Sequence, residues 1–266
     1  MVTKQKFYKL LFYPSLEIKM KLVLPINPSE YIHILGTEDY ITQSRIFSRI
    51  FLSKNLNLKR QNELVHGNNA LVLSLGDSLN LDKTLTNGIL EEINVEDGAG
   101  KVILPERLTQ IFDERHAIGK VYRGEALDAV FGDGNVRYHV FSPEGIKQIT
   151  ECLDSNTLML NKRIDLVHFI REAHTSDGLP RKDVKEGDFY YWFPISGAVA
   201  WLYACSDRAF LGCYRGQSNS YSGLRVRAKI STGNLKHFLQ ELRDKYKVPE
   251  KKKYYTRERI LEQLKI

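Results

Sequence analysis

Few residues in this sequence stand in a pattern that could catalyse a reaction. Glu17 and Lys19 lie two residues apart in a segment where polar and apolar residues alternate. Metal-dependent nucleases combine carboxylates that converge on a divalent ion with a nearby lysine. His139, and His174 with Asp177 three residues later, could instead transfer protons without a metal. These residues are the catalytic candidates, and magnesium is an expected cofactor only if the protein is a nuclease.

Neither candidate set is a complete catalytic signature. A magnesium site would need a second carboxylate near Glu17, and no acidic residue precedes it in this sequence. The cysteines Cys152, Cys205 and Cys213 lack the paired spacing of zinc ligands, so we predict no metal site of that kind. The sequence by itself therefore does not identify a reaction.

A basic strand near the end of the sequence is the stronger sign of function. Cations alternate with apolar residues between Leu224 and Ile230, so the two-residue period of a strand places the cations on one face. A polar loop precedes them, and its Arg, Gln and Asn side chains are suited to reading base edges. The predicted DNA-contact residues are Arg215, Gln217, Asn219, Arg225, Arg227 and Lys229. The alternative is an edge strand whose charges prevent aggregation.

The same order of residues occurs earlier in the sequence. Segments 119–150 and 212–242 each contain Tyr-Arg-Gly, a loop, a glycine, a basic strand, a serine and then an expected helix. The pattern indicates either an internal duplication or a chance similarity of two strand–helix units. If the segments are related, Lys101, Arg107, Arg123 and Arg137 form a second half of the DNA-contact surface.

The segment from Asp97 to Ile146 joins these features. It begins with an acidic, glycine-rich turn and a short strand, and Pro105 then opens a helix with Leu108, Ile111 and Phe112 on one face. It resembles the swapped-hairpin barrel module of the AbrB and MraZ families on the residues Gly100, Lys101, Leu104, Pro105, Arg107, Leu108, Gly134, Asn135, Val140, Ser142, Pro143 and Glu144. The resemblance implies DNA binding by a small barrel. A long spacer after Phe112 and an insertion at 127–131 depart from those families.

Other elements are expected on either side of this segment. Apolar spacing predicts an amphipathic helix over 38–52, and a Ser-Pro-Glu start predicts another over 145–154. Residues 78–96 read as a loop with a weak element near its end. Aromatic and apolar runs predict central strands over 188–193 and 198–203. We predict an α+β fold with a strand-rich, barrel-like core and flanking amphipathic helices.

Composition limits the class of protein. The 266 residues are 42% hydrophobic and 11% aromatic, which is enough for a packed core. The expected regions are 1–94, 95–155 and 156–266, or one continuous domain. The odd number of cysteines and the lack of a long apolar run predict a cytoplasmic protein that does not enter a membrane.

The net charge of +7 favours an acidic partner, with nucleic acid first. We therefore predict a sequence-specific protein that binds double-stranded DNA. A homodimer is expected because two-fold DNA-binding modules are commonly dimers. The first alternative is a DNA-cleaving enzyme of the restriction-endonuclease class. The second is a structural or interaction protein whose basic surface meets an acidic protein.

Overall fold

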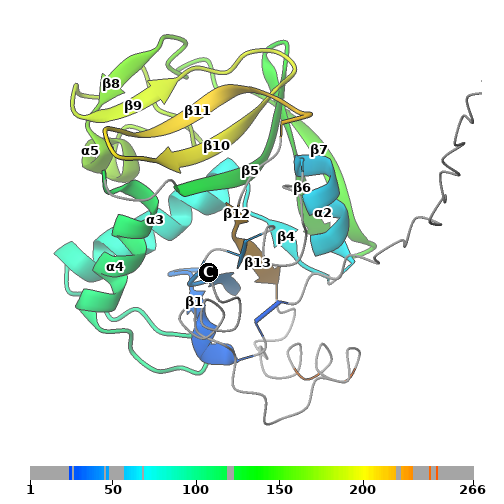
Figure 1. The fold of residues 1–266 in the computed structure, drawn as a ribbon, viewed down its shortest axis with the longest axis vertical. Coiled ribbons are helices and arrows are strands. Elements are labelled where there is room, and N and C mark those ends of the chain that lie inside the picture. The colour runs from blue at the N-terminus through cyan, green and yellow to red at the C-terminus, as the bar shows by residue number, and fades with distance from the viewer. Residues whose placement is uncertain are drawn as a thin grey trace, which may run out of the picture.

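The computed structural model describes residues 24–25, 27–44, 46–47, 57–67, 69–118, 123–219, 223–229, 240 and 244. These residues form two β-sheets with helices packed around them (Figure 1). The predicted α+β class is confirmed. The described strands do not close into a barrel, so the expected barrel-like core is an open sheet arrangement.

The larger sheet has β5 near its middle. Its strand order is β3-β12-β5-β10-β11-β9-β8, and β6 and β7 extend it from β5 as an antiparallel meander. The strands are β3 (Ile46–Phe47), β5 (Arg123–Gly132), β6 (Asn135–Ser142), β7 (Gly145–Cys152), β8 (Lys162–Ile164), β9 (Phe189–Trp192), β10 (Ala198–Ala204), β11 (Ala209–Gly216) and β12 (Gly223–Leu224).

The smaller sheet has the order β1-β2-β13-β4, and its neighbouring strands are antiparallel. It contains β1 (Tyr31–His33), β2 (Asp39–Thr42), β4 (Leu71–Val72) and β13 (Val226–Lys229), and the short 3-10 helix η1 (Pro28–Glu30) precedes β1. Strands from the beginning and the end of the chain therefore pair in both sheets. Strands from the three expected regions, 1–94, 95–155 and 156–266, therefore hydrogen-bond to one another in the same sheets.

Local sequence explains where the helices begin. The helices are α2 (Leu58–His66), α3 (Leu75–Leu90), α4 (Pro105–His116) and α5 (Leu166–Arg171). Asn57 caps α2, and Ser74 with Asp77 forms a capping box at the start of α3. Pro105 occupies the first turn of α4, where its missing N–H costs no hydrogen bond.

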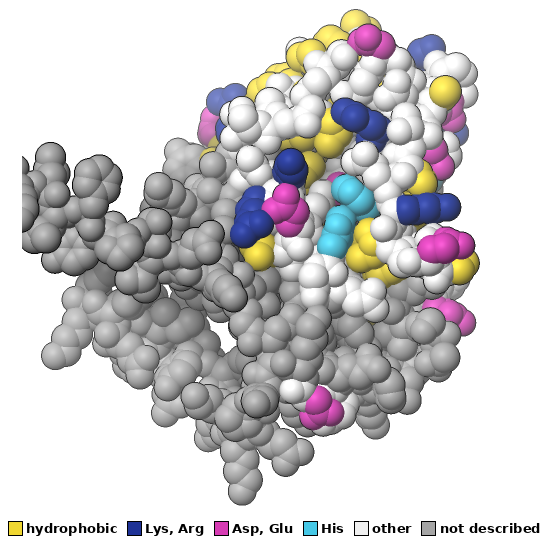
Figure 2. Space-filling model, turned by 90° about the vertical axis from the view of Figure 1, so that its right-hand side faces the viewer, with side chains coloured by type: hydrophobic (Ala, Val, Ile, Leu, Met, Phe, Trp, Pro, Cys, Tyr) yellow, Lys and Arg dark blue, Asp and Glu magenta, His cyan; other side chains and the backbone are white. Residues whose placement is uncertain are grey.

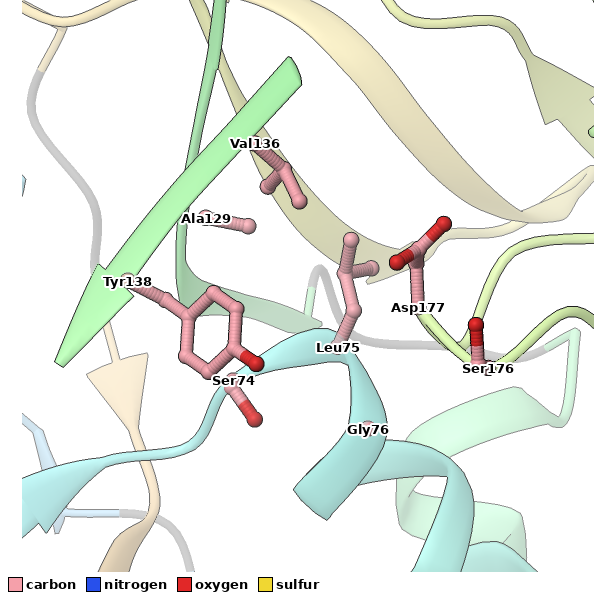
Figure 3. A pocket seen from close by; sticks show the side chains of 8 residues that line it. All are labelled: Ser74, Leu75, Gly76, Ala129, Val136, Tyr138, Ser176 and Asp177. Atoms are coloured by element: carbon pink, nitrogen blue, oxygen red, sulfur yellow. The ribbon is translucent and has the colours of Figure 1, made fainter. Parts of the chain in front are cut away.

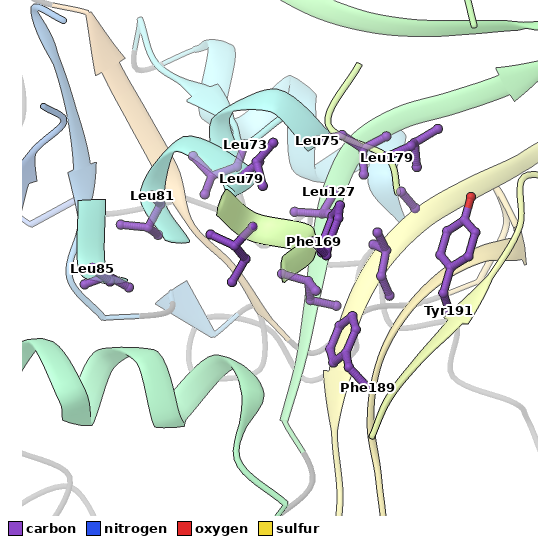
Figure 4. Close-up of a cluster of buried hydrophobic side chains, with 14 of the residues drawn as sticks. Leu73, Leu75, Leu79, Leu81, Leu85, Leu127, Phe169, Leu179, Phe189 and Tyr191 are labelled. Atoms are coloured by element: carbon purple, nitrogen blue, oxygen red, sulfur yellow. The ribbon is translucent and has the colours of Figure 1, made fainter. Parts of the chain in front are cut away.

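Strand β5 separates two hydrophobic cores because its side chains alternate between the two faces of the sheet. Leu127, Ala129 and Phe131 pack with α3, α4 and α5 on one face. Ala126 and Val130 pack with α2 and the smaller sheet on the other. Figure 4 shows Leu75 and Leu79 of α3 in the same cluster as Leu127 and as Phe169 of α5.

The structure corrects several expected elements. The helix predicted over 38–52 is wrong, because the described part contains β2 and β3 instead. The helix predicted over 145–154 is strand β7, and the loop predicted over 78–96 is largely helix α3. The helix opened by Pro105 and the strands near 188–193 and 198–203 are confirmed as α4, β9 and β10. No described helix is both long and apolar enough to cross a bilayer.

Candidate active site

The candidate site begins with an aspartate in the middle of β5. Asp128 is 1% exposed, and its neighbours along the strand are apolar. Its carboxylate accepts a 2.7 Å hydrogen bond from the backbone N–H of His139 on β6. Nδ1 of the same histidine lies 2.9 Å from Oδ2 of Asp128. The carboxylate thus fixes the orientation of the ring and leaves Nε2 as its other polar atom.

Helix α2 supplies the second side of the site. Leu58, Asn62 and His66 recur every four residues, so they share one face of the helix. Nδ2 of Asn62 donates a 2.8 Å hydrogen bond to Oδ1 of Asp128. The ring of His66 meets the ring of His139 edge to face, with 4.5 Å between the centroids. Residues from distant parts of the chain therefore form one connected group.

These residues line a pocket of about 350 Å³. The polar residues that line it include Lys59, Asn62, His66, Asp128, His139 and Gln217. Figure 2 shows the face formed by α2 and the β6–β7 hairpin, with histidine side chains in cyan at its centre and Lys and Arg side chains around them. The volume lies within the usual range of small-molecule sites.

The electrostatics of the site favour a neutral His66. Burial lowers its pKa, the neighbouring His139 lowers it further, and Asp128 offsets part of that effect. A proton on one imidazole disfavours a proton on the other, because the rings are in contact. The lowered pKa favours His66 as a neutral proton acceptor.

Two polar atoms at the site have no hydrogen-bond partner. They are Nε2 of His66 and Oδ1 of Asn62, and both are buried. The orientation of the Asn62 amide is fixed because its Nδ2 must donate to the Asp128 carboxylate. An unpaired buried acceptor costs about 1–3 kcal/mol. Such atoms are uncommon in folded proteins and require an explanation.

Cations flank the histidine pair. Lys59 lines the pocket, and Arg137 lies two residues before His139, on the same face of β6. Arg137 pairs in register with Val130, which also lines the pocket. Another cation of α2, Arg60, forms a 2.6 Å ion pair with Glu63 and so offsets its charge. The lining also contains the carboxylates of Glu63 and Asp128, so its charge is mixed, and Lys59 is a cation in it that can meet an anionic ligand.

The other catalytic candidates lie elsewhere. Glu17 and Lys19 fall outside the described residues. Nε2 of His174 lies 2.8 Å from Nζ of Lys83, and Nδ1 lies 3.2 Å from the carbonyl oxygen of Phe169. Burial lowers the pKa of His174, and the charge of Lys83 lowers it further. These contacts describe a neutral histidine whose two ring nitrogens are already used.

Asp177 lies at a different cavity. Its carboxylate accepts a 2.8 Å hydrogen bond from the backbone N–H of Asp154. The cavity measures about 40 Å³ and is formed between the start of α3, strand β6 and the loop that carries Asp177 (Figure 3). It has room for water but not for a larger substrate. The structure therefore does not join Asp177 to His174 as a catalytic pair.

The predicted DNA-contact strand is partly buried in the protein. Arg225 is 0% exposed, and its guanidinium donates to Glu125 at 3.1 Å, to Glu114 at 3.2 Å and to the carbonyl oxygen of Thr42 at 3.0 Å. We correct its assignment as a DNA contact, because a buried guanidinium with these partners cannot reach a phosphate in the folded protein.

Arg225 belongs to a buried ion cluster of Arg115, Arg225, Asp82, Glu114 and Glu125. Arg115 donates to Glu125 at 2.5 Å and to Asp82 at 2.8 Å. Burial alone would raise the pKa of Asp82, but the charge of Arg115 lowers it to about 2. The acids of the cluster thus neutralise its arginines inside the fold.

Arg227 also has acidic partners within the protein. Its guanidinium lies 2.6 Å from Asp77 and 2.8 Å from Asp39. Arg225 and Arg227 therefore do not present unpaired cations on one face of the strand. The side chain of Lys229 lies outside the described part. The expected contact strand is better explained as a structural element that ties the smaller sheet to β5 and α3.

The other predicted contacts are dispersed. Lys101 is exposed in the loop before α4, and Arg107 on α4 donates to Gln43 at 3.2 Å. The guanidinium of Arg215 stacks 4.0 Å above the ring of Trp201. Gln217 lines the histidine pocket, and the backbone N–H of Asn219 bonds to Gly216. The side chain of Arg123 lies outside the described part.

The structure thus brings His139, Arg137 and Gln217 to one region and leaves the other predicted residues apart. His66, Asn62, Lys59 and Asp128 were missed as site residues. A carboxylate inside an apolar strand is itself a signal, because aspartate is rarely fully buried without a role. Nothing in the local sequence would have selected His66.

Among the described residues, no group of three or more His, Cys, Asp or Glu side chains is arranged to hold a metal ion. Comparison of the chain with protein-family models, with curated proteins and with solved structures finds no match. The geometry of the histidine pocket is therefore the guide to function.

Proposed function

We propose that the protein is a nuclease that cleaves a phosphodiester by acid–base catalysis at His66 and His139. The observation that carries this proposal is the contact between two imidazoles that line a pocket, where buried Asp128 orients one of them. A positioned proton donor and acceptor typically accelerate a reaction by about 10²–10⁴-fold each. The arrangement has the elements needed for two proton transfers.

The surroundings of the pocket favour nucleic acid as the substrate. Lys59 lines the pocket and Arg137 lies two residues from His139 on the same face of β6, and phosphate contacts need such cations. Gln148 and Gln217 line the same pocket and can hydrogen-bond to bases or sugars. The net charge of +7 would attract a polyanion at long range.

Of the functions expected from the sequence, nucleic-acid cleavage is now favoured over DNA binding without cleavage. Sequence-specific binding of double-stranded DNA loses Arg225 and Arg227 as contacts, because both are paired within the fold. The cleavage alternative gains a specific site. Double-stranded DNA is one of the substrates to be tested, and binding to it without cleavage would favour the DNA-binding alternative.

The test is a cleavage assay of the full chain on labelled single- and double-stranded DNA and RNA, each with magnesium and with excess EDTA. We expect cleavage that persists in EDTA and falls by about 10²–10⁴-fold in His139→Ala and in His66→Ala. His174→Ala is the matched control, since it changes a half-buried histidine outside the pocket. Full activity in both pocket variants would refute the proposal.

A gel shift on the same nucleic acids at two salt concentrations accompanies the assay. A salt-sensitive shift of duplex DNA without cleavage of any nucleic acid would also refute the nuclease proposal and would favour a DNA-binding protein, because counterion release depends on phosphate contacts. Cleavage that appears only with magnesium would refute catalysis by the histidine pair alone and would favour Glu17 and Lys19 as catalytic residues.

A further inference from the structure

We infer that the substrate is RNA and that the 2′-hydroxyl of the substrate is the nucleophile. This inference rests on the proposed nuclease function and assigns the substrate class to the same pocket. It follows from what lines the pocket, from an unpaired acceptor in it, and from the chemistry of two contacting imidazoles.

The first observation is the lack of a protein hydroxyl or thiol at the site. No Ser, Thr, Tyr or Cys is among the described residues that line the pocket. Covalent catalysis by a hydroxyl or a thiol would need one of these groups next to the base, and the pocket carboxylates Asp128 and Glu63 are already engaged by Asn62 and His139 and by Arg60. Among the described residues, this leaves the substrate or water as the source of the attacking oxygen, and the 2′-hydroxyl of RNA is already held next to the phosphorus atom.

The second observation is the buried acceptor Oδ1 of Asn62. It has no hydrogen-bond partner, whereas Nδ2 of the same side chain is held by Asp128. Asn62 is 7% exposed and lines the pocket next to both histidines. A ligand that supplies an O–H or N–H donor would satisfy this oxygen, and RNA offers such donors on its bases and on its other ribose hydroxyls.

The third observation assigns roles to the two imidazoles. His66 is held neutral by burial and by its neighbour, so it can accept the proton of the 2′-hydroxyl. Asp128 receives the Nδ1–H of His139, and a carboxylate in this position stabilises an imidazolium. His139 is therefore the proton donor for the leaving oxygen.

The reaction balances without any further reactant. His66 removes the proton from the 2′-hydroxyl, and the 2′-oxygen forms a bond to phosphorus. The bond from phosphorus to the 5′-oxygen breaks, and His139 gives its proton to that oxygen. The products are a 2′,3′-cyclic phosphate and a 5′-hydroxyl. The enzyme is left with protonated His66 and neutral His139, and proton exchange through water restores the starting state.

The cations are placed for this substrate. Lys59 of α2 lines the pocket, and Arg137 lies two residues before His139 on the same face of β6. They would offset the charge that develops on the phosphate oxygens as the 2′-oxygen adds. Replacing either cation should therefore lower kcat more than it raises KM.

The test uses the full chain in EDTA with DNA strands that contain a single ribonucleotide, in versions with each of the bases. We expect cleavage only on the 3′ side of the ribonucleotide, and mass spectrometry should find the cyclic phosphate on the upstream fragment. Placing a 2′-O-methyl group on that ribonucleotide should abolish cleavage. The all-DNA strand of the same sequence is the matched control.

The outcomes separate the inference from the proposed function. Cleavage of the all-DNA and 2′-O-methyl strands at the rate of the ribonucleotide strand would overturn the inference and leave the nuclease proposal standing. An upstream fragment with a linear 3′-phosphate from the first turnover would also overturn the internal nucleophile. No cleavage of any strand would overturn both.

Discussion

Replacing Arg225 by alanine should unfold the protein more easily rather than remove a nucleic-acid contact. The guanidinium is fully buried and donates to Glu125, Glu114 and the carbonyl oxygen of Thr42. Arg225→Ala would leave the Glu125 carboxylate, which is 4% exposed, with Arg115 as its remaining ion-pair partner. It would also leave the Thr42 carbonyl oxygen without this donor.

The expected size of this effect follows from these contacts. Removing one partner from a buried ion pair typically costs about 3–5 kcal/mol, because the other charge stays buried. For a chain of this length, one kcal/mol corresponds to about 2–4 °C in Tm. We therefore expect Tm to fall by about 6–20 °C, by multiplying these two ranges.

Urea denaturation followed by circular dichroism would measure the free energy of unfolding, and calorimetry would measure Tm. Lys101→Ala is the control, since it also removes one positive charge but from an exposed side chain, and it should change the free energy by less than about 0.5 kcal/mol. An Arg225→Ala protein that is as stable as the wild type, yet has lost nucleic-acid binding, would refute the buried-cluster reasoning.

Three further predictions concern the site and the turns. Asp128→Asn should reduce kcat by about 10²–10⁴-fold, because Nδ1 of His139 loses its carboxylate partner; an unchanged kcat would contradict the role assigned to it. The pKa of His66 lies below its ordinary value of 6.5 through burial and the charge of its neighbour, so His139→Gln should raise it in an NMR titration, and a fall would contradict the assigned cause. Gly178→Ala should lower the free energy of unfolding, measured by urea denaturation, more than Gly134→Ala. Both glycines have a positive φ, +81° at Gly178 and +69° at Gly134, but only at Gly178 would the new Cβ lie 2.7 Å from a backbone atom, the carbonyl carbon of Leu75.

Local signals in the sequence predicted some elements correctly. Pro105 followed by a helical apolar spacing gave α4, and the aromatic and apolar runs gave β9 and β10. The capping residues Ser74 and Asp77 were also visible and would have revealed α3, where a loop was expected instead. These features act over a few residues, so they can be recognised without the fold.

Other elements depend on contacts that the sequence does not show. Ser142, Pro143 and Glu144 resemble a helix start, yet Ser142 pairs with Gly145, whose φ of +120° permits a tight hairpin. The residues after this turn then pair with β6 and form strand β7. Tertiary pairing overrides a local helix signal in this case.

The candidate site shows the same division. His139 was selected because histidine titrates near neutral pH, but its partner Asp128 lies across a strand pair and His66 lies on a distant helix. The alternation of Arg225 and Arg227 has the same appearance whether the cations face solvent or buried acids. One acid partner of Arg225, Glu125, is 100 positions away, so sequence spacing could not decide between these environments.

Strand β5 carries one carboxylate that stabilises the fold and another that belongs to the candidate site. Glu125 and Asp128 are three residues apart, so their side chains point to opposite faces of the strand. Glu125 accepts from two buried arginines, which offsets the cost of burying its charge. Asp128 accepts instead from N–H groups of Asn62 and His139, which belong to the pocket. The ion cluster can therefore hold β5 between its two cores while Asp128 orients a histidine, because each carboxylate has its own partners.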